Sequence, residues 1–351
     1  MKKIIFYSSK PYEKEFFEVE NNNFNFKIDY YEVKLNQDTV VLSKGYDAVC
    51  AFIHDNLNSD VLKFLKQNNI DVVALRSAGY NNVDLKKAYE YKIHILRVPK
   101  YSPYAVAEHT IALILALNRK IHKAYIRTRE LNFEIEGLIG FDLYSKKAGV
   151  IGTGNIGKIV AKILSLGFGM EVLLYDVYPD YDFAKSINSK YANLDEIYKE
   201  CDIITLHCPL TKDTYHLIDK QAFSKMKNGV MLINTSRGQL INTKDLIEAL
   251  KSGKVGYAGL DVYEEEDEYF FEDYSTKGLP DDILARLLTF PNVLITSHQA
   301  FFTKEALQNI AKTTMKNLYD YFNGNPLENE VCYKCGQDKN SCNKLTVGRC
   351  F

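Results

Sequence analysis

The sequence predicts an α/β protein built from two doubly wound parallel-sheet domains. Short apolar runs of strand length alternate with polar helical segments through the first hundred residues, and the same alternation returns after residue 146. A long, mostly apolar helical pattern separates the two series, and an amphipathic helical pattern follows the second. At 351 residues the chain is longer than one hydrophobic core usually supports, so two domains are the default.

The N-terminal series has the rhythm of strands joined through helices, which produces a parallel sheet. Its apolar runs span residues 2–8, 46–53, 72–77 and 92–98. Ser77, Ala78 and Gly79 begin a turn-rich loop that leaves the carboxyl end of the third run. Because ligands bind at that edge of open α/β sheets, we expect this loop to face a ligand.

A long helical pattern over residues 105–128 follows a break in the rhythm between Pro99 and Pro103. Its first half is apolar almost all round, so we expect that half to be buried, between domains or at a subunit contact. His109 lies in this half. A histidine on an apolar helix is more often a hydrogen-bonded core residue than a catalyst, and we interpret His109 in that way.

A glycine-rich turn opens the second series, between a short apolar run and an amphipathic helical pattern. The turn consists of Gly152, Thr153, Gly154, Asn155, Ile156 and Gly157. This order suits a dinucleotide pyrophosphate, which binds at the N-terminus of a helix where backbone N–H groups are unpaired. Asp176 closes the next strand, where a carboxylate accepts hydrogen bonds from ribose hydroxyls and repels a 2′-phosphate. The pattern therefore predicts a Rossmann-type domain that prefers NAD to NADP.

Four later strands carry polar residues at their carboxyl ends, which is the layout of a cofactor cleft. These residues are His207, the run Thr235, Ser236 and Arg237, then Asp261, and finally Ser297 with His298. Arg237 offers a planar fork matched to a carboxylate. Histidine is the side chain best suited to acid/base chemistry at physiological pH, so His298 is a candidate acid/base, and Glu266 is placed to pair with its imidazole. The alternatives are a surface ion pair for Arg237, a core position for His298 and a solvated loop for Glu266.

The domain boundaries follow from the final helical pattern, residues 303–324. Because one α/β series precedes the glycine turn and this helix follows the second series, we expect it to return to the first series. The prediction is a substrate domain of residues 1–100 and 299–330, into which the Rossmann-type domain, residues 101–298, is inserted. The outer domain is expected to be flavodoxin-like.

Composition excludes several functional classes. The formal net charge is −1 and charges of both signs are interspersed, which argues against a nucleic-acid partner. The opening residues contain only a four-residue apolar run, too short for a signal peptide, and no stretch approaches membrane-spanning length. We therefore expect a soluble, cytoplasmic protein.

Taken in order, the segments GTGNIG, LHCPLT, MLINTSRG, GLDVYEEE and TSHQAF resemble the D-isomer-specific 2-hydroxyacid dehydrogenase family. The segments ALRSAGYNNVDL, YSPYAVAEHTIALILALNR and FFED are most similar to its fermentative D-lactate branch. The resemblance covers residues 1–330 and implies catalytic roles for Arg237 as substrate clamp, His298 as acid/base and Glu266 as the orienting partner of His298.

The same resemblance implies further site residues. A loop that lines the cofactor falls on His207, Cys208 and Pro209, and Asp261 matches a contact to the nicotinamide carboxamide. Residues implied to bind substrate are Ser77, Ala78 and Gly79 through backbone N–H groups, and Tyr101, Phe301 and Phe52 through aromatic rings.

The implied activity is the reversible, NADH-dependent reduction of pyruvate, or a close small 2-oxo acid, to the D-2-hydroxy acid. One alternative is another branch of the family, acting on branched-chain 2-hydroxy acids or phosphoglycerate, or of the vancomycin-resistance type. A second alternative is an NADH-sensing binding protein similar to the corepressors that share the fold. Because the helical pattern after Tyr101 is so apolar, we also expect a homodimer or homotetramer built on the cofactor domains.

The C-terminal tail, residues 331–351, extends beyond the family pattern. It contains Cys332, Cys335, Cys342 and Cys350, and its other residues are mostly polar. A Cys-x-x-Cys pair has the right width for two ligands of a tetrahedral zinc ion, so one hypothesis is a structural zinc site. Disulfides, the other way to order such a segment, are rare in a reducing cytoplasm. The alternative to a zinc site is therefore a flexible appendage. Neither version predicts a direct contribution to catalysis.

Overall fold

The structure is a computed structural model that describes residues 1–334 and 343–351, so Cys335 and Cys342 lie outside the described residues. The chain divides into two compact units. Unit 1 consists of Met1–Ser102 and Phe302–Phe351, and unit 2 consists of Pro103–Phe301. The chain therefore passes between the units after Ser102 and after Phe301.

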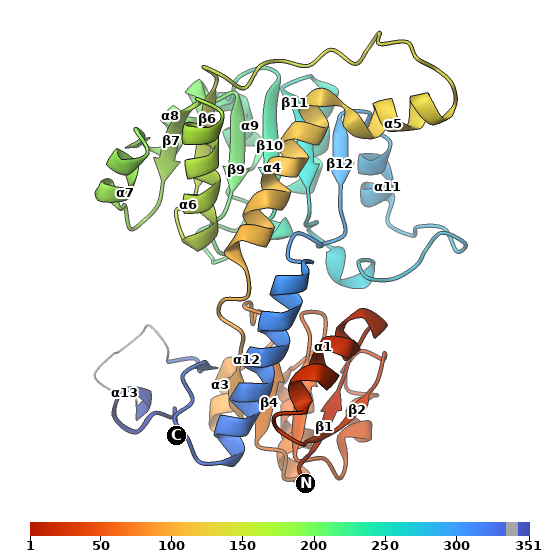
Figure 1. The fold of residues 1–351 in the computed structure, drawn as a ribbon, viewed down its shortest axis with the longest axis vertical. Coiled ribbons are helices and arrows are strands. Elements are labelled where there is room, and N and C mark those ends of the chain that lie inside the picture. The colour runs from red at the N-terminus through yellow and green to blue at the C-terminus, as the bar shows by residue number, and fades with distance from the viewer. Residues whose placement is uncertain (335–342) are drawn as a thin grey trace. The chain divides into compact units, whose positions relative to one another are not determined.

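Unit 1 is built on a sheet whose described strands have the order β13-β5-β4-β3-β1-β2 (Figure 1). The strands are β1 (Lys3–Phe6), β2 (Lys27–Tyr30), β3 (Ala48–Ala51), β4 (Val72–Leu75), β5 (His94–Leu96) and β13 (Glu330–Val331). Strands β1 to β5 pair in parallel, and β13 is antiparallel to β5. The chain order along this sheet places the ends of β3 and β4 side by side, so the loops that leave them lie at one edge.

Helices cover both faces of the unit 1 sheet. They are α1 (Pro11–Asn21), α2 (Ser59–Gln67), α3 (Leu85–Glu90), α12 (Lys304–Phe322) and α13 (Asn343–Val347), with a 3₁₀ turn at Val40–Ser43. Side chains of α2 and α3 pack with one set of alternate strand residues in a single buried cluster. Helices α1 and α12 contact each other, and the ring of Phe17 in α1 lies 4.8 Å from that of Phe6 in β1.

Unit 2 contains an all-parallel sheet of strand order β12-β11-β10-β9-β6-β7-β8. The strands are β6 (Lys147–Ile151), β7 (Glu171–Tyr175), β8 (Lys190–Tyr191), β9 (Ile203–Leu206), β10 (Val230–Asn234), β11 (Val255–Leu260) and β12 (Val293–Ile295). The central strands β6, β9 and β10 are buried almost throughout. Continuous apolar strands of this kind are typical of parallel sheets that helices cover on both faces.

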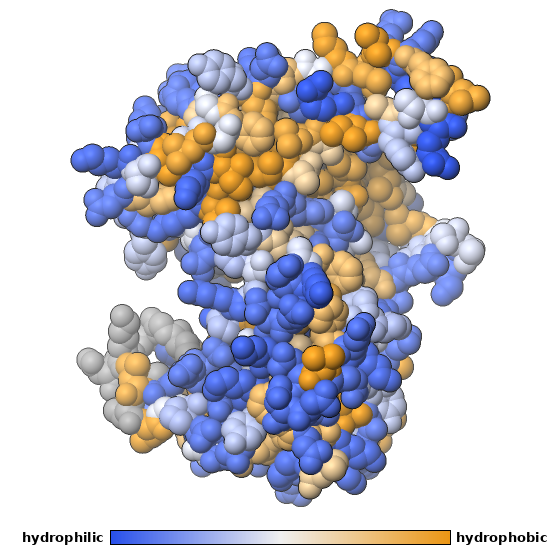
Figure 2. All heavy atoms as spheres, viewed as in Figure 1, coloured by the Kyte–Doolittle hydropathy of each residue, from blue (hydrophilic) through white to orange (hydrophobic). Residues whose placement is uncertain are grey.

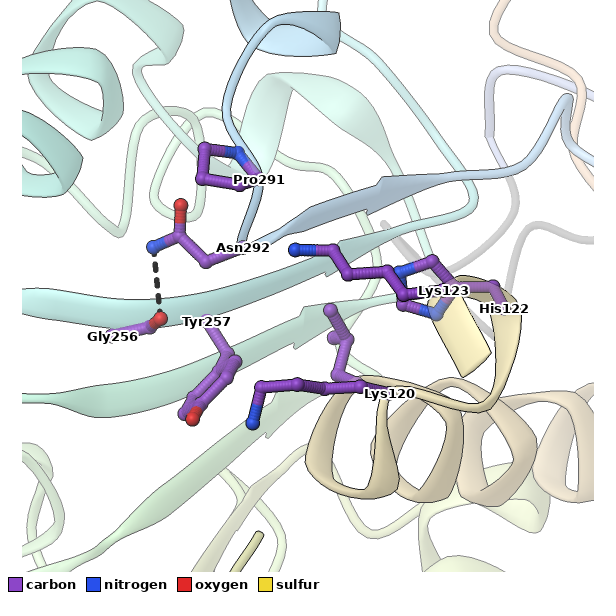
Figure 3. A pocket seen from close by; sticks show the side chains of 8 residues that line it. Lys120, His122, Lys123, Gly256, Tyr257, Pro291 and Asn292 are labelled. Carbon is purple, nitrogen blue, oxygen red and sulfur yellow. Dashed lines mark hydrogen bonds between the residues drawn. The ribbon is translucent and has the colours of Figure 1, made fainter. Parts of the chain in front are cut away.

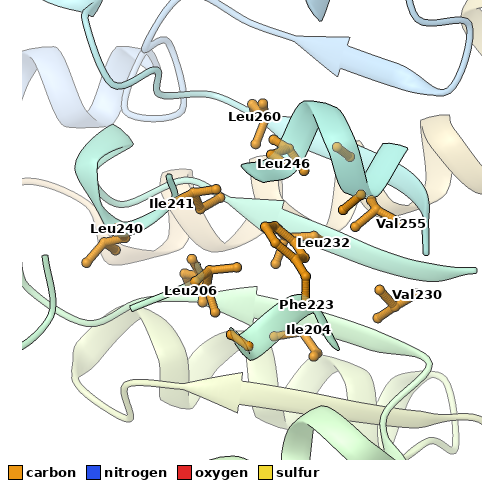
Figure 4. Packing of buried hydrophobic residues seen from close by; sticks show 14 of the residues in the cluster. Ile204, Leu206, Phe223, Val230, Leu232, Leu240, Ile241, Leu246, Val255 and Leu260 are labelled. Atoms are coloured by element: carbon orange, nitrogen blue, oxygen red, sulfur yellow. The ribbon is translucent and has the colours of Figure 1, made fainter. Parts of the chain in front are cut away.

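Two separate cores lie on the two faces of the unit 2 sheet. The helices are α4 (Pro103–Arg119), α5 (Ile121–Arg129), α6 (Asn155–Lys162), α7 (Tyr181–Ser186), α8 (Leu194–Glu200), α9 (Lys220–Lys225), α10 (Thr243–Lys251) and α11 (Asp282–Leu288). Helices α4, α6 and α7 pack on one face, where α4 and α6 cross the sheet in Figure 1. Helices α8 to α11 pack on the other face through residues that include Phe223, Leu232 and Leu246 (Figure 4).

Short turns of other helix types complete unit 2. They are the π-helical turn Ile163–Gly167 and the 3₁₀ turns Gly238–Leu240 and Glu266–Glu268. The π-helical turn continues directly from α6 and leads into β7. Several α-helices of the unit begin at a side chain that accepts a backbone N–H; for example, Asn242 accepts the N–H of Asp245 at the start of α10.

The predicted α/β fold with parallel sheets is confirmed, with differences in single elements. Strand β2 was not predicted, because its sequence KIDY lacks an apolar run and it pairs only along one side with β1. The predicted helix over residues 105–128 is broken at Lys120, which adopts a left-handed conformation with φ of 51°. Burial of its first half is confirmed, because α4 buries Ile111, Leu113 and other apolar residues within unit 2.

None of the described helices is long and apolar enough to cross a membrane. Polar side chains dominate much of the surface seen in Figure 2, and apolar side chains gather over part of unit 2.

Candidate functional site

The glycine turn has the geometry that a dinucleotide requires. Gly152 has a positive φ of 97°, and a Cβ at this position would lie 2.5 Å from the backbone nitrogen of Cys208. A Cβ on Gly157 would lie 1.9 Å from the carbonyl oxygen of Gly152, so helix α6 can approach the turn only because residue 157 is glycine. A Cβ on Gly154 would meet nothing within 4 Å among the described residues, which leaves this part of the backbone open to a ligand. The N-terminus of α6 at Asn155 faces that opening with unpaired N–H groups.

Asp176 lies directly after β7 and is tied to the glycine turn. Its Oδ2 accepts hydrogen bonds from the Thr153 backbone N–H at 2.6 Å and from the Thr153 hydroxyl at 3.1 Å, and its Oδ1 accepts from the Tyr178 N–H at 3.0 Å. The Thr153 hydroxyl also lies 2.8 Å from the hydroxyl of Tyr191 in β8. The carboxylate is therefore held in place beside the turn, where an adenosine ribose would meet it.

The next predicted cofactor residues lie at the carboxyl ends of β9 and β10, which pair in parallel. The Ser236 hydroxyl donates to the carbonyl of Cys208 at 2.8 Å, which connects the two strand ends directly. The Thr235 hydroxyl lies 2.8 Å from that of Thr110 in α4. Burial lowers the pKa of His207 well below its usual range, so this ring is neutral at physiological pH.

The Cys208 thiol and Pro209 complete this stretch. Burial raises the pKa of Cys208 to about 11, so the thiol stays protonated and unreactive at neutral pH. Pro209 is exposed, and its carbonyl accepts the hydroxyl of Thr214 at 2.7 Å, which fixes the loop that follows β9.

Asp261, at the end of β11, is the centre of a buried hydrogen-bond network. Its Oδ1 accepts from the Thr296 hydroxyl at 2.5 Å, and its two oxygens accept the N–H groups of Gln299 and Ala300 at 2.9 Å each. His109 of α4 joins the same network, with Nε2 at 3.0 Å from the Thr296 hydroxyl and 3.4 Å from Asp261. The interpretation of His109 as a hydrogen-bonded residue is confirmed, and its partner Thr296 connects it to the predicted site residue Asp261.

His298 and Glu266 form a close pair within unit 2. Nδ1 of His298 lies 2.6 Å from Oε1 of Glu266, and the other carboxylate oxygen accepts the Tyr263 N–H at 2.8 Å. His298 has a positive φ of 51°, and its N–H donates to the Asp261 carbonyl at 2.7 Å. A left-handed conformation at a residue other than glycine costs on the order of 1 kcal/mol and is typical of functional positions. The contact with Glu266 engages Nδ1 and so fixes the orientation of the imidazole ring.

Arg237 lies in the turn after β10, and its backbone is fixed by Asn234. The Asn234 amide donates to the Arg237 carbonyl at 2.8 Å and accepts the Ser236 N–H at 3.0 Å. The guanidinium donates to the Ser236 carbonyl at 2.6 Å, and no carboxylate among the described residues forms an ion pair with it. Its charge is therefore available to an acidic ligand.

The loop of Ser77, Ala78 and Gly79 leaves the carboxyl end of β4 in unit 1. The Ser77 hydroxyl donates to the Gly79 carbonyl at 2.7 Å, and the Ser77 carbonyl accepts the Val98 N–H at 2.9 Å. Arg97 donates to the Ala78 carbonyl at 2.9 Å. Because these carbonyls are bonded within unit 1, the loop N–H groups are the polar groups left for an anionic ligand.

Two aromatic residues predicted to contact substrate lie at the ends of the two units. The carbonyl of Tyr101, in unit 1, accepts the Asn309 amide of α12 at 2.6 Å. Phe301, the last residue of unit 2, is buried. Phe52, in unit 1, lies with its ring 5.3 Å from the Arg76 guanidinium.

Comparison with known proteins decides the family. Residues 111–300 match the family described as D-isomer specific 2-hydroxyacid dehydrogenase, NAD binding domain. The chain belongs to this family. A 2-hydroxyacid dehydrogenase homolog of Haemophilus influenzae is 50% identical over 329 residues, which cover 94% of this chain and 99% of the relative. The D-lactate dehydrogenase of Escherichia coli is 47% identical with the same coverage, and its apo structure superimposes with a TM-score of 0.85, covering 94% and 99% of the two chains.

This dehydrogenase contains a buried arginine that the sequence analysis missed. Arg76 follows β4, immediately before the loop of Ser77, and is 1% exposed. Its Nε and Nη2 donate to the two carboxylate oxygens of Glu13 at 3.0 Å each, and Nη2 also donates to the carbonyls of Tyr7 and Ser8. A buried charge requires such a partner, because desolvation of an unpaired ion costs several kcal/mol. The sequence did contain a signal for such a residue, because Arg76 is a charged residue inside the apolar run of residues 72–77.

The described part of the C-terminal tail packs on unit 1 of the dehydrogenase. Oε1 of Glu330 lies 2.6 Å from Nδ1 of His94 in β5, and Oε2 accepts the Cys350 N–H at 2.7 Å. The Phe351 ring stacks on His94 at 4.3 Å. Burial raises the pKa of Cys350, and the neighbouring Glu330 carboxylate and Cys332 thiol add to the rise.

The metal hypothesis for the tail remains a prediction. Among the described residues, no group of three or more His, Cys, Asp or Glu side chains is arranged to hold a metal ion. Cys332 and Cys350 are buried, and the other two proposed ligands, Cys335 and Cys342, lie outside the described residues.

Proposed function

We propose that this enzyme reduces pyruvate, or a close small 2-oxo acid, to the D-2-hydroxy acid with NADH, and catalyses the reverse reaction. The observation that carries the proposal is the pair of His298 and Glu266 in the same unit as the carboxylate-free guanidinium of Arg237. The similarity to a D-lactate dehydrogenase over nearly the whole length supports the small substrate. Under this proposal the enzyme serves a fermentative, cytoplasmic role in which NADH is reoxidised.

Each residue of the trio has a chemical task. Arg237 holds the substrate carboxylate and draws electron density from the C2 carbonyl, because its planar fork donates to two oxygens at once. His298 donates a proton from Nε2 to the developing alkoxide, and Glu266 stabilises the protonated ring in the required orientation. The nicotinamide, when bound, supplies the hydride. The loop N–H groups of residues 77–79 receive the substrate carboxylate, and the D configuration of the product follows the family.

The residues around the glycine turn define where NAD would bind. Gly152 to Gly157 would receive the pyrophosphate, and Asp176 would accept the ribose hydroxyls. Asp261 would accept the carboxamide N–H. Its side-chain oxygens are already fixed by Thr296, Gln299 and Ala300, so the acceptor is held in place before a ligand arrives.

A substrate panel tests the proposal. Purified enzyme with NADH is assayed for absorbance loss with pyruvate, 2-oxobutyrate, 2-oxoisocaproate and hydroxypyruvate. The expected result is the highest kcat/KM for pyruvate. Preference for 2-oxoisocaproate would assign a branched-chain enzyme, and preference for hydroxypyruvate a glycerate-type enzyme. NADH binding without turnover of any of them would favour the corepressor-like sensor and contradict the proposal.

We also propose that the enzyme is a homo-oligomer whose contact is the segment that follows α5, residues 131–144. The sequence analysis expected an oligomer because the helical pattern of α4 is apolar. The apolar residues of α4 are buried within unit 2, so they do not indicate a subunit contact. Five large apolar side chains are exposed within this segment: Leu131, Phe133, Ile135, Ile139 and Tyr144. Exposed apolar side chains gathered in one segment are typical of an interface, and a second copy of the same surface would cover them. Light scattering is expected to give at least twice the 40.2 kDa chain mass.

A further inference from the structure

A pocket lies at the edge of the unit 2 sheet opposite to the glycine turn. It has a volume of about 230 Å³ and is formed where α4 passes into α5, beside the amino ends of β11 and β12. Its lining residues are Leu117, Lys120, His122, Lys123, Gly256, Tyr257, Pro291 and Asn292 (Figure 3). The glycine turn follows the carboxyl end of β6 in the same parallel sheet, so this pocket is distinct from the cofactor site.

The pocket collects positive charge without a compensating carboxylate. Lys120, His122 and Lys123 come from the α4–α5 junction, and no acidic residue is among the described residues that line it. The sheet side contributes Gly256, Tyr257, Pro291 and Asn292, none of which carries a charge at neutral pH. The Lys120 ammonium donates to the carbonyl of Ile139 and lies 5.5 Å from the centre of the Tyr257 ring, so its contacts are dipolar rather than ionic.

The charged forms of two of these basic residues are disfavoured. Burial lowers the pKa of Lys123, and the neighbouring charges of Lys120 and Arg127 lower it further. Burial and the charge of Lys123 lower the pKa of His122, and the backbone of Ala116 partly opposes this shift. The Nδ1 atom of His122 is buried and has no hydrogen-bond partner among the described residues. Like charges brought together in this way are stabilised by an anion placed between them.

The backbone supports the same arrangement. The left-handed conformation of Lys120, with φ of 51°, turns the chain so that two cationic residues at positions 122 and 123 return over the strand ends. Figure 3 shows the Lys123 side chain extending toward Asn292 and the Lys120 side chain lying beside Tyr257. The Asn292 amide donates to the Gly256 carbonyl at 2.8 Å, which fixes the opposite wall.

We propose that this pocket is a second ligand site that binds a small doubly charged oxyanion, such as a phosphate group or a dicarboxylate. Lys120 and Lys123 are the charged donors and His122 becomes a donor through Nδ1 when it is protonated. The pocket volume admits a group of this size, and the absence of a lining carboxylate distinguishes it from a cation site. The proposal concerns a binding site only and is independent of the reaction at His298.

Calorimetry with sulfate tests the proposal, because sulfate remains a dianion throughout the neutral and mildly acidic pH range. The enzyme is first saturated with NADH, so that the glycine turn is occupied, and ionic strength is kept constant with chloride. Lys123→Gln is expected to weaken sulfate binding about tenfold or more, the scale of one charge-assisted hydrogen bond. Lys123→Arg is expected to retain it. Lys185→Gln, a change at an exposed lysine of α7, is the matched control and should bind as the wild type does.

Proton uptake gives a second measurement. Because a bound dianion favours the charged forms of Lys123 and His122, binding is expected to take up protons and to tighten as pH falls. Titration in two buffers with different heats of ionisation measures that uptake. Inorganic phosphate and malonate, titrated in the same way, distinguish phosphate groups from dicarboxylates as the preferred ligand. Sulfate binding that Lys123→Gln leaves unchanged, or no binding of any of the three anions, would overturn the proposal.

Discussion

At the scale of single residues, the proposed chemistry depends on how Glu266 holds His298. The 2.6 Å contact fixes one ring nitrogen, so under this proposal the other nitrogen would meet the substrate in a single orientation. Glu266→Gln keeps the size of the side chain but removes its charge. We expect kcat/KM for pyruvate to fall by on the order of a hundredfold, within the range of general acid–base catalysis. Glu265→Gln, at the exposed neighbouring position, is the control, and equal activity of the two variants would separate Glu266 from the reaction.

Arg237 is predicted to act through its shape as well as its charge. Lysine at this position retains the charge but loses the planar fork that donates to a carboxylate and a carbonyl together. Arg237→Lys is therefore expected to lower kcat/KM for pyruvate by roughly two orders of magnitude, the scale of losing one transition-state donor. Arg286→Lys on the exposed face of α11 should leave steady-state kinetics unchanged. A rise in KM alone, with kcat intact, would limit Arg237 to ground-state binding.

We propose that the preference for NADH over NADPH depends on a single carboxylate, that of Asp176. Asp176 is half-buried and tied to Thr153, so it cannot move away from a 2′-phosphate without breaking the bonds of 2.6 and 3.1 Å. Asp176→Ala is expected to narrow the preference for NADH over NADPH, chiefly by improving kcat/KM with NADPH. Asp182→Ala, on the exposed side of α7, is the comparison variant. The assignment fails if the wild-type enzyme already uses both cofactors equally.

At the scale of elements, the sequence predicted the parts that repeat a local pattern and missed those that depend on distant partners. The glycine turn and the apolar strands are local signals. Arg76 meets Glu13 across 63 positions, and His109 meets Thr296 across 187, so no window of sequence contains both members of either pair. The break at Lys120 was missed because neither glycine nor proline marks it.

Arg97 illustrates how an element positions the candidate site. It follows β5, donates through Nη1 to the Ala78 carbonyl at 2.9 Å, and lies with its guanidinium 5.2 Å from the Tyr80 ring. The charge also lies close to the loop that would receive a carboxylate. We expect Arg97→Met to raise KM for pyruvate about tenfold with a smaller change in kcat, because loop order and local charge are lost while the His298 pair remains.

The control for Arg97 is Lys86→Met, on the exposed face of α3 in the same unit. A variant of Arg97 with unchanged KM would show that the loop is ordered without it. Thermal unfolding of both variants, measured in parallel, separates a loss of substrate binding from a general loss of stability.

At the scale of the whole molecule, we expect the tail to contribute to the stability of unit 1 and not to the reaction. Glu330 joins β5 through His94 and the last turn of the chain through Cys350, while Lys344 donates to the carbonyls of Glu328 and Glu330. Arg349 donates to the carbonyls of Asp320 and Asn325 near the end of α12. Arg97, which supports the loop of residues 77–79, does not depend on these tail contacts. Its N–H donates to the carbonyl of Asn329, which precedes the tail.

Truncation after Glu330 is therefore expected to lower Tm by several degrees, on the order of the loss of a few kcal/mol, and to leave kcat and KM for pyruvate near those of the full-length enzyme. Differential scanning calorimetry and steady-state kinetics on both proteins measure the two effects. Elemental analysis of the full-length enzyme examines the zinc hypothesis at the same time: about one zinc per chain would support a site that includes Cys335 and Cys342. If the full-length enzyme contains no metal and its Tm still exceeds that of the truncated enzyme, packing and hydrogen bonds account for the stabilisation. Loss of turnover in the truncated enzyme would show that the tail acts on the candidate site after all.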